Sequence, residues 1–464
     1  MAKRGLIIVS NRLPVAIKEV DGKLRAERAI GGVATALNAV AERHKARWVG
    51  WSGLPRVLPA KELAALHFPQ GFVPVQAGPG LVRRYYDHIS NSLLWPSLHG
   101  MFTDFVPTPK DWQAFKEMNR RFAEAVQNTI ESPNDLIWVH DYHLMLVPRF
   151  LREAGVTNRI GFFLHTPFAA PEFMLGLPYA KELLGGMCAA DVVGFQTEGD
   201  VDNFWGSLEI AGCPTAPGLA GVFPIGADFK AFRAAGAKPS VRQKIQKQLK
   251  AIKGKSVIFS LSRLDYTKGI VAQLLAVERF FAKNPNRENL VYKLVVAPSR
   301  EQLGEYQELK RTIERVARRI NQRLRTKHWQ PIEYSYENLG FEDVVAWYKV
   351  AGTLLLLPEK DGMNLVSKEY IAARDRDEGV LVLSKGMGSA FQLPEALLVD
   401  AQDTEAAAVA LERAQKMSDS EQSGRWQALR SGVRDQDIFW WAENFLQALV
   451  GHSRRRQPHV IAKN

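Results

Sequence analysis

Short, largely apolar runs, each followed by polar residues, recur along the chain and constrain its fold more than any other feature. A strand inside a parallel sheet is buried on both faces, so its sequence is continuously apolar rather than alternating. Such runs occupy residues 6–9, 136–139, 160–164, 191–195, 257–260, 293–297, 353–357 and 379–383. Helical patterns lie between several of them, and this alternation predicts an α/β fold with parallel sheets.

The length of 464 residues exceeds what one core usually supports, so we expect two domains of similar size. The small residues and the proline of segment 234–240 indicate a linker. We therefore predict an N-terminal domain over residues 1–235 and a C-terminal domain over residues 236–435. Residues 436–464 would form a helix that crosses back to the N-terminal domain, followed by a mobile basic tail.

The composition, with 46% hydrophobic and 24% charged residues, is that of an ordinary globular protein. No apolar stretch reaches the ~20 residues that span a bilayer, and the N-terminus has no signal-peptide core, so we expect a cytoplasmic protein without membrane contact. The net charge of +12 suits anionic small substrates, because the basic residues are scattered and no nucleic-acid recognition motif is present. Cys188 and Cys213 form neither a disulfide framework nor a metal-ligand pattern.

The stretch 360–370 combines a turn with a helix start, directly after an apolar run. Pro358 and Gly362 mark the turn, and a helix that opens near Asn364 would direct free backbone N–H groups at one point. Such a point suits an anion or a cluster of sugar hydroxyls, and the Glu369 carboxylate near the same helix face can accept hydrogen bonds from hydroxyls. The alternative is an ordinary strand, turn and helix with a capping Asn and a solvated Glu.

Polar residues stand at the ends of the predicted strands in the first half of the chain. Arg12, Asp141 and His165 each follow one of the apolar runs. In open parallel sheets ligands bind beyond the carboxyl ends of strands, so this repetition predicts a ligand site. His165 is the strongest histidine candidate, because Pro167 marks a sharp exit from its strand, whereas His140 fits a structural histidine.

Two further features of the first half fit a ligand site. The glycine pair Gly31 and Gly32 opens a helix next to the first strand, although a turn that needs positive φ would explain it as well. The stretch 85–99 mixes aromatic and polar residues without a clean period, and Tyr86 and Trp95 could offer the aromatic faces that sugar rings prefer. Core packing is the alternative for these aromatic rings.

Arg263 and Lys268 flank a turn and a helix start in the second half of the chain. Two fixed cations at such a place suit a diphosphate leaving group, because negative charge develops there as a glycosidic bond breaks. The alternative is a surface Arg and Lys with Asp265 as their partner. Arg300 adds another cation just after a predicted strand.

Taken in order, these motifs resemble the trehalose-6-phosphate synthase family over about residues 6–449. The blocks that carry the resemblance are residues 10–12, 31–32, 86, 94–96, 138–142, 162–168, 263–269, 298–300 and 361–366. The resemblance implies an α/β GT-B fold of two Rossmann-like domains that face a central cleft. It also implies transfer of glucose from UDP-glucose to glucose 6-phosphate with retention of configuration, with the acceptor on the N-terminal domain and the nucleotide sugar on the C-terminal domain.

The resemblance also implies roles for individual residues. The catalytic group would comprise Arg263 and Lys268, which hold the donor diphosphate, and Asp141 and His165, which orient hydroxyls. The donor site would comprise Gly31, Gly32, Arg263, Lys268, Asp361, Gly362, Met363, Asn364, Leu365, Val366 and Glu369. The acceptor site would comprise Arg12, Tyr86, Trp95, Asp141 and Arg300.

No metal or other cofactor is implied, and the expected partners are the two small substrates, a second copy of the chain and a separate trehalose-phosphate phosphatase that acts downstream. Two departures from the family pattern lie on the donor side. Residues 357–360 read Leu-Pro-Glu-Lys instead of the usual Thr-Pro-Leu-Arg, and Gln392 replaces a Glu. GDP and ADP therefore stay open as alternatives to UDP. Alternative functions are a glucosylglycerol-phosphate synthase and a catalytically silent regulator that binds sugar phosphate.

Overall fold

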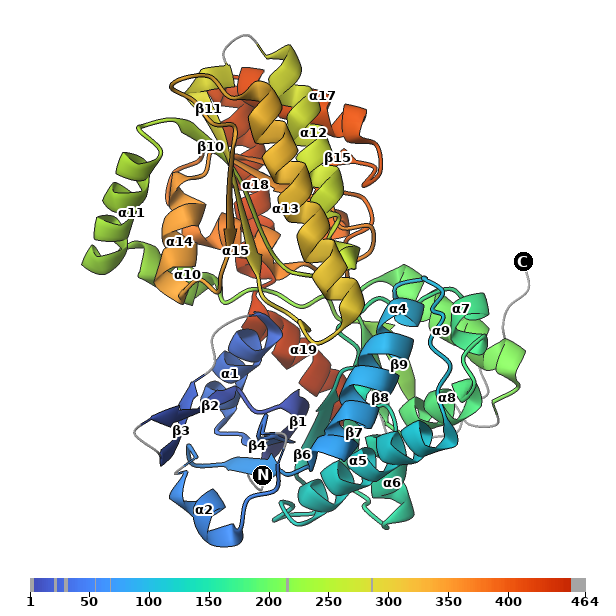
Figure 1. The fold of residues 1–464 in the computed structure, drawn as a ribbon. Helices are drawn as coiled ribbons and strands as arrows, with labels where there is room; N and C mark the ends of the chain where they lie inside the picture. Colours follow the sequence, from blue (N-terminus) through green and yellow to red (C-terminus); the bar gives the residue numbers. More distant parts are fainter. Residues whose placement is uncertain are drawn as a thin grey trace. The chain divides into compact units, whose positions relative to one another are not determined.

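The computed structural model describes residues 4–20, 23–28, 32–54, 56–66, 68–213, 217–284 and 287–451 (Figure 1). The chain divides into two compact units, which we call the N-terminal unit (Met1–Pro224 with Trp441–Asn464) and the C-terminal unit (Ile225–Trp440). The boundaries expected at residues 235 and 436 both lie inside the C-terminal unit. The tail expected after the last helix lies outside the described residues.

The N-terminal unit is built on a seven-stranded sheet whose neighbouring strands are all parallel. In spatial order the strands are β5 (Phe72–Val75), β4 (Arg47–Trp51), β1 (Leu6–Arg12), β6 (Leu136–His140), β7 (Arg159–Phe163), β8 (Val192–Phe195) and β9 (Leu219–Val222). The chain adds β4 and β5 on one side of β1 and then returns to add β6 on the other side. The strand order therefore switches between β1 and β6. An antiparallel pair, β2 (Val15–Val20) and β3 (Lys23–Arg28), lies outside this sheet.

Helices connect the parallel strands of this unit, because parallel neighbours need a crossover. The helices of this unit are α1 (Gly32–His44), α2 (Ala60–Ala65), α3 (Pro79–Val82), η1 (Arg83–Leu94), α4 (Trp95–Leu98), α5 (Pro109–Gln127), η2 (Tyr142–Leu144), α6 (Val147–Glu153), α7 (Pro171–Leu175), α8 (Ala180–Cys188), α9 (Glu198–Ala211) and α19 (Ile438–Gly451), which begins in the C-terminal unit and follows the last strand. The stretch 85–99, which has no clean period in the sequence, is helical as far as Leu98: η1, which begins at Arg83, is a π-helix, and α4 follows it. None of the helices that the structure describes is long and apolar enough to cross a membrane.

The C-terminal unit contains a six-stranded parallel sheet. In spatial order its strands are β12 (Ile332–Tyr336), β11 (Leu290–Ala297), β10 (Ser256–Arg263), β13 (Thr353–Leu356), β14 (Val380–Ser384) and β15 (Leu397–Val399). Its helices are α10 (Phe229–Gly236), α11 (Pro239–Ala251), η3 (Tyr266–Lys268), α12 (Ile270–Lys283), η4 (Arg287–Asn289), α13 (Gly304–Leu324), α14 (Phe341–Val350), α15 (Leu365–Ala373), α16 (Gly388–Gln392), α17 (Thr404–Lys416) and α18 (Asp419–Asp435). The strand order switches between β10 and β13.

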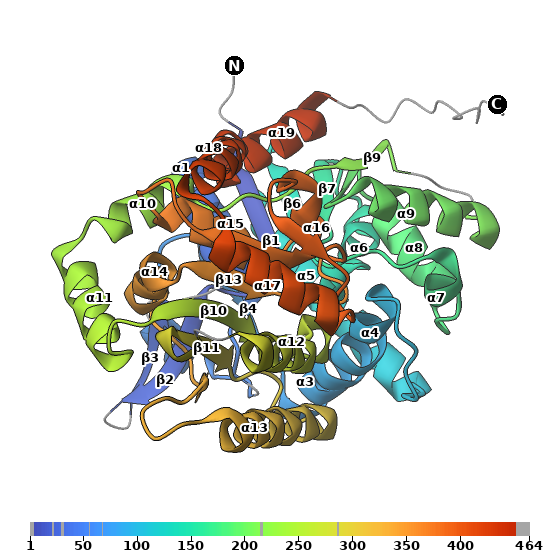
Figure 2. The same cartoon turned by 90° about the horizontal axis from the view of Figure 1, so that it is seen from above.

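Helices cover both faces of this second sheet (Figure 2). Successive residues of β10 serve opposite faces: Ile258 joins the core cluster that includes α12 and α13, whereas Val257 and Phe259 join the cluster that includes α14 and α15. A strand with core on both faces must be apolar throughout, which is the pattern that the sequence shows. The predicted α/β class with parallel sheets is confirmed.

The segment 234–240 is largely helical, although its composition indicates a linker. Helix α10 ends at Gly236, and α11 begins at Pro239. Alanine has the highest helix propensity, so the small residues Ala234 and Ala235 extend α10 rather than interrupt it. Proline fits the first turn of a helix, where its missing N–H leaves no hydrogen bond unmade.

Helix α19 is anchored on the sheet of the N-terminal unit by Phe445, which is fully buried. The ring of Phe445 stacks on Trp138 of β6, with centroids 4.7 Å apart and an interplanar angle of 10°. Gly161 of β7 and Gly194 of β8 make room for the ring, because a Cβ there would lie 2.5 Å and 2.7 Å from its carbons. The last described helix is therefore part of the core of this unit.

Replacing Phe445 by Ala should lower the free energy of unfolding of the N-terminal unit by about 3–5 kcal/mol, because a buried ring is lost and a cavity stays behind. Urea unfolding followed by tryptophan fluorescence measures the change, since Trp138 and Trp441 lie beside each other and Phe445 lies against Trp138. Phe391→Ala is the matched control, because the Phe391 side chain is 75% exposed and its loss should cost about 0.5 kcal/mol or less. Equal losses for the two variants would contradict the anchoring role of Phe445.

Candidate active site

The predicted site residues gather where the strand order of each sheet switches. In the N-terminal unit Arg12 is the last residue of β1, and Asp141 follows β6. In the C-terminal unit Arg263 is the last residue of β10, and Asp361 lies in the turn after β13. Crevices form at such switch points, since the connections on the two sides leave in opposite directions. Each sheet thus presents polar groups where open α/β sheets bind ligands.

Arg12 lies over two aromatic rings. Its guanidinium carbon is 4.6 Å from the ring centroid of Trp51 and 5.4 Å from that of Tyr86. Tyr86 in turn stacks on His143, with centroids 5.8 Å apart and an interplanar angle of 12°. Cation–π contacts hold a guanidinium in place without using its N–H donors, and the Arg12 side chain is exposed. This arrangement leaves a planar cation ready for a phosphate or carboxylate.

Trp95 packs in the core, as the alternative interpretation of these aromatic rings expected. Its side chain is 6% exposed, and its ring lies 4.2 Å from that of His99 and 5.8 Å from that of Tyr142, measured between centroids. A buried ring with these neighbours supports the aromatic core of the unit rather than an open sugar platform. Trp51, which the sequence reasoning missed, offers its face to Arg12 instead.

Asp141 has a positive φ of 76°, an uncommon backbone conformation for a residue other than glycine. Such strain costs about 1–3 kcal/mol and clusters at functional sites. Its Oδ1 accepts a hydrogen bond of 3.3 Å from the backbone N–H of His165, and its Oδ2 lies 3.8 Å from Nδ1 of His143. The carboxylate therefore links the two strand ends after β6 and β7.

The rings of His140 and His165 share a hydrogen bond of 3.1 Å between Nδ1 of His140 and Nε2 of His165. Burial lowers the pKa of His165 to about 3, and burial together with the His165 ring lowers the pKa of His140 well below its ordinary value. Both rings are therefore neutral near pH 7. Nδ1 of His165 is buried and has no hydrogen-bond partner among the described residues. A neutral ring with one unused nitrogen can orient a hydroxyl but is a poor proton donor.

Lys268 is held on Asp361 at the switch point of the C-terminal unit. Its Nζ lies 2.6 Å from Oδ2 of Asp361, and the same oxygen accepts a 3.0 Å hydrogen bond from the Asn364 side-chain amide. Asn364 has a φ of 66° and precedes the first residue of α15. Lys268 is 8% exposed, so its side chain is held beside the carboxylate and cannot move freely in water. Arg263, five residues earlier, is exposed at the end of β10.

Three glycines enclose the turn between β13 and α15. A Cβ at Gly269 would lie 1.9 Å from the carbonyl oxygen of Leu357, and a Cβ at Gly386 would lie 1.9 Å from that of Glu359. A Cβ at Gly388 would also lie 1.9 Å from a carbonyl oxygen, that of Gly362. These are backbone contacts that cannot give way. The loops after β10 and β14 therefore fix the turn from both sides.

Backbone hydrogen bonds complete this support. The N–H of Glu359 donates to Thr267 at 3.1 Å, and the N–H of Asp361 donates to Gly386 at 3.1 Å. Within the turn, Gly362 and Met363 are buried, whereas Leu365 and Val366 at the start of α15 are half-buried. The first turn of the helix is thus partly accessible, as an anion site at a helix start requires. Gly32 is the first residue of α1, and Gly31 lies outside the described residues.

Glu369 lies in the second turn of α15 and accepts a 2.8 Å hydrogen bond from the hydroxyl of Tyr348 on α14. Burial raises the pKa of Glu369 to about 7. Tyr348 donates to Oε2, which leaves Oε1 as an acceptor for a ligand hydroxyl. No motif points to Tyr348, because the two residues meet only once α14 and α15 are packed together.

Arg300 is committed to an ion pair inside the C-terminal unit. Its guanidinium lies 2.9 Å from Oδ2 of Asp265, and the two side chains are 5% and 0% exposed. Its φ of 48° is also unusual for a residue other than glycine. The alternative interpretation gave Asp265 to Arg263 and Lys268. In the structure Asp265 pairs with Arg300, and its Oδ1 accepts a hydrogen bond from the backbone N–H of Thr267 at 3.1 Å.

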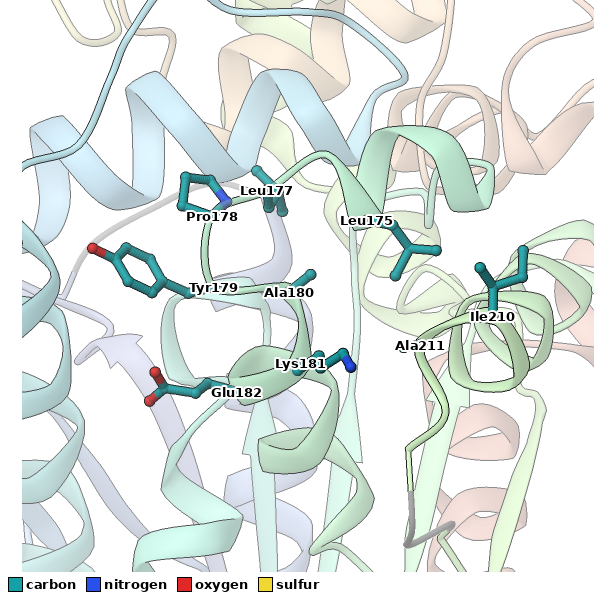
Figure 3. Close-up of a pocket in the computed structure, with 9 residues that line it drawn as sticks. All are labelled: Leu175, Leu177, Pro178, Tyr179, Ala180, Lys181, Glu182, Ile210 and Ala211. Carbon is teal, nitrogen blue, oxygen red and sulfur yellow. The ribbon is translucent and has the colours of Figure 1, made fainter.

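A surface hollow of ≈ 490 Å³ lies elsewhere in the N-terminal unit (Figure 3). It is lined by Leu175, Leu177, Pro178, Tyr179, Ala180, Lys181, Glu182, Ile210 and Ala211. The side chains of Leu175 and Ile210 point toward one another across it (Figure 3). None of the predicted site residues lines it, and its mostly apolar lining does not suit a sugar phosphate. Among the described residues no group of three or more His, Cys, Asp or Glu side chains is arranged to hold a metal ion.

Comparison with known proteins places this geometry in a family. The family model described as "Glycosyltransferase family 20" matches residues 4–450. The chain is 37% identical, over 97% of its length, to the bifunctional trehalose-6-phosphate synthase/phosphatase of Thermoproteus tenax, of which it spans 64%.

Two solved structures have a similar fold. The E. coli trehalose-6-phosphate structure bound with UDP-2-fluoro glucose has a TM-score of 0.87 and 31% identity, covering 97% of this chain and 100% of that one. The α,α-trehalose-phosphate synthase (UDP-forming) of Burkholderia xenovorans in complex with glucose-6-phosphate has a TM-score of 0.85 and 30% identity, covering 96% and 100%. The chain therefore has the GT-B fold and belongs to glycosyltransferase family 20, the trehalose-6-phosphate synthase family.

Proposed function

We propose that this chain is an α,α-trehalose-6-phosphate synthase, which transfers glucose from UDP-glucose to glucose 6-phosphate with retention of configuration. The observation that carries the proposal is the cationic strand end of the C-terminal unit, where Arg263 closes β10 and Lys268 is held on Asp361. The chain belongs to a glycosyltransferase family, and glycosyl transfer is a reaction in which such cations would stabilise the leaving group. The E. coli and B. xenovorans structures, with UDP-2-fluoro glucose and glucose-6-phosphate, support the choice of donor and acceptor.

Positioning and charge stabilisation carry the proposed reaction. Arg263 and Lys268 stabilise the diphosphate as its bond to C1 of glucose breaks. The acceptor hydroxyl bonds to C1 on the face of the glucose ring from which the diphosphate leaves. An oxygen of the leaving diphosphate takes the hydroxyl proton, so no enzymic nucleophile is required. Asp141 and the neutral His165 orient sugar hydroxyls. In the turn after β13, Asp361 uses Oδ2 for Lys268 and Asn364, which leaves Oδ1 for a glucose hydroxyl.

The acceptor phosphate is assigned first to Arg12. Its guanidinium rests on Trp51 and Tyr86 with its N–H donors available, as a bidentate phosphate contact requires. Arg300 is the weaker candidate, because its ion pair with Asp265 would have to rearrange before it could meet a phosphate. Glycerol 3-phosphate also carries a phosphate that Arg12 could bind, so this contact does not distinguish it from glucose 6-phosphate as the acceptor.

The proposal also covers partners and location. Two fixed cations already supply the positive charge that the diphosphate needs, so we expect no metal requirement. The product is a sugar phosphate, and release of free trehalose requires a phosphatase, which we expect to be a separate protein. The T. tenax relative is named as a synthase and phosphatase in one chain. A homo-oligomer in the cytoplasm completes the proposal and follows from the family resemblance alone.

Product formation tests the proposed function directly. Purified protein is given UDP-, GDP- or ADP-glucose with either glucose 6-phosphate or glycerol 3-phosphate, and products are identified by mass and by the NMR coupling at the anomeric positions. We expect an α,α-linked disaccharide phosphate from UDP-glucose and glucose 6-phosphate. Turnover of glycerol 3-phosphate alone would assign the chain to glucosylglycerol-phosphate synthesis. Sugar-phosphate binding without turnover of any donor would indicate a regulator.

Lys268→Met should lower kcat by about 10²–10³-fold, because it removes one of the two charges that stabilise the leaving diphosphate. The KM for glucose 6-phosphate should change little. Steady-state kinetics with each substrate varied in turn measures both effects. Lys283→Met is the matched control, since Lys283 is also ion-paired, with Glu405, but is exposed at the end of α12. A Lys268→Met variant with normal kcat would remove this lysine from the catalytic group.

The KM for UDP-glucose should rise as the pH falls below about 7, because the pKa of Glu369 in the free protein is raised to about 7. The carboxylate accepts hydrogen bonds from ribose hydroxyls, whereas the protonated acid loses acceptor capacity, so affinity is highest above the pKa. Kinetics from about pH 6 to about pH 8 measures this dependence. Glu369→Gln cannot ionise and should raise KM while flattening its pH dependence. An identical pH profile in the two proteins would assign the effect to another group.

A further inference from the structure

Lys368 is a buried lysine that the proposed mechanism does not use. It lies on α15 beside Glu369, and it is 2% exposed. Its Nζ donates to the carbonyl oxygen of Ile225 at 2.6 Å and to Oε1 of Gln392 at 2.5 Å. Among the described residues no carboxylate lies within ion-pair distance of this ammonium. Burial without a counter-charge lowers the pKa of Lys368 to about 7.

The two acceptors connect α15 to the segments where the chain passes between its units. Ile225 is the first residue of the C-terminal unit. The side-chain amide of Gln392, the other acceptor, donates to Oε1 of Gln436, which lies just before the return crossing. Lys368 thus reaches the first segment directly and the second through one amide.

The two crossing segments also lie against each other within the C-terminal unit. The N–H of Ile438 donates to the carbonyl oxygen of Ala227 at 3.1 Å. Gly226 approaches the second segment so closely that a Cβ there would lie 2.4 Å from the carbonyl oxygen of Gln436. Segments 225–228 and 436–440 therefore form one packed pair, which we call the crossing pair.

A lysine at this position is energetically unfavourable if its only role is packing. Burying an ammonium without a carboxylate costs several kcal/mol, whereas a methionine of similar length would fill the same volume without that cost. The charge does strengthen the hydrogen bonds to Ile225 and Gln392, since charge-assisted bonds are about twice as strong as neutral ones. The side chain is therefore suited to holding α15 and the crossing pair in a fixed relation.

We propose that Lys368 is a positioning residue of the proposed glucosyl transfer, one that ties the donor-binding helix α15 to the crossing pair. The inference rests on the proposed function for the role of α15. A nucleotide that contacts Glu369 and the first turn of α15 restrains the helix, and Lys368 passes this restraint to Ile225 and, through Gln392, to Gln436. Donor binding then changes the mobility of both crossing segments.

Hydrogen exchange with and without UDP tests the proposal on the full chain. In the wild-type protein UDP should slow exchange in peptides that contain residues 225–228 and 436–440. Lys368→Met should abolish the UDP-dependent change in both segments and raise the KM for UDP-glucose by about tenfold or more, with the KM for glucose 6-phosphate unchanged. Gln392→Met cuts only the second path, so the effect of UDP should disappear at 436–440 and persist at 225–228.

Lys293→Met is the matched control, because Lys293 is a half-buried lysine of the C-terminal unit that donates to the hydroxyl of Ser335 at 2.6 Å. It should leave the UDP-dependent exchange of the crossing pair intact. Equal loss in this control, an undiminished UDP effect in Lys368→Met, or no UDP effect in the wild-type protein would each overturn the proposal. Product formation by the wild-type protein is scored separately, so a failure of the proposed function is recognised independently.

Discussion

The proposed donor site depends on the close approach of backbone to backbone around the turn after β13. Gly269, Gly386 and Gly388 lie so near the carbonyl groups of this turn that any side chain would overlap them. The glycines come from the loops after β10 and β14, the two neighbours of β13, so sheet order decides which loops can grip the turn. Once the turn is fixed, Asp361 faces Lys268 and α15 starts at a defined place.

The sequence predicted the inner strands except β4 and missed the edge strands for a physical reason. A continuous apolar run marks a strand that is buried on both faces, as in β1, β6 and β10. Of the strands that no run revealed, β5, β9, β12 and β15 are the four edges of the two parallel sheets, β4 is an inner strand, and β2 and β3 form the separate pair. Edge strands are covered less completely, and the half-exposed residues of β9 and β12 carry a mixed pattern that resembles a loop.

The sequence could place the candidate site residues at strand ends, but it could not predict their partners. Strand ends are local features, whereas the pairs Glu369–Tyr348 and Arg300–Asp265 form only when elements far apart in sequence become neighbours. The parallel register of β10 and β11 sets Arg263 opposite Ala297, and this brings the loop that carries Arg300 beside Asp265. Sequence patterns locate a cation after each strand but do not show which carboxylate will pair with it.

In the proposed reaction, little has to move at the cationic strand end of the C-terminal unit when the diphosphate binds. An ammonium that is buried alone pays a large desolvation penalty, but Lys268 lies against Asp361 and keeps donors to spare, because each lysine has three. Its position is therefore set before the ligand binds, and the cost of ordering a flexible side chain is met during folding. Cations that are fixed before the ligand binds stabilise a departing anion without rearrangement, which is the condition for catalysis by preorganised electrostatics.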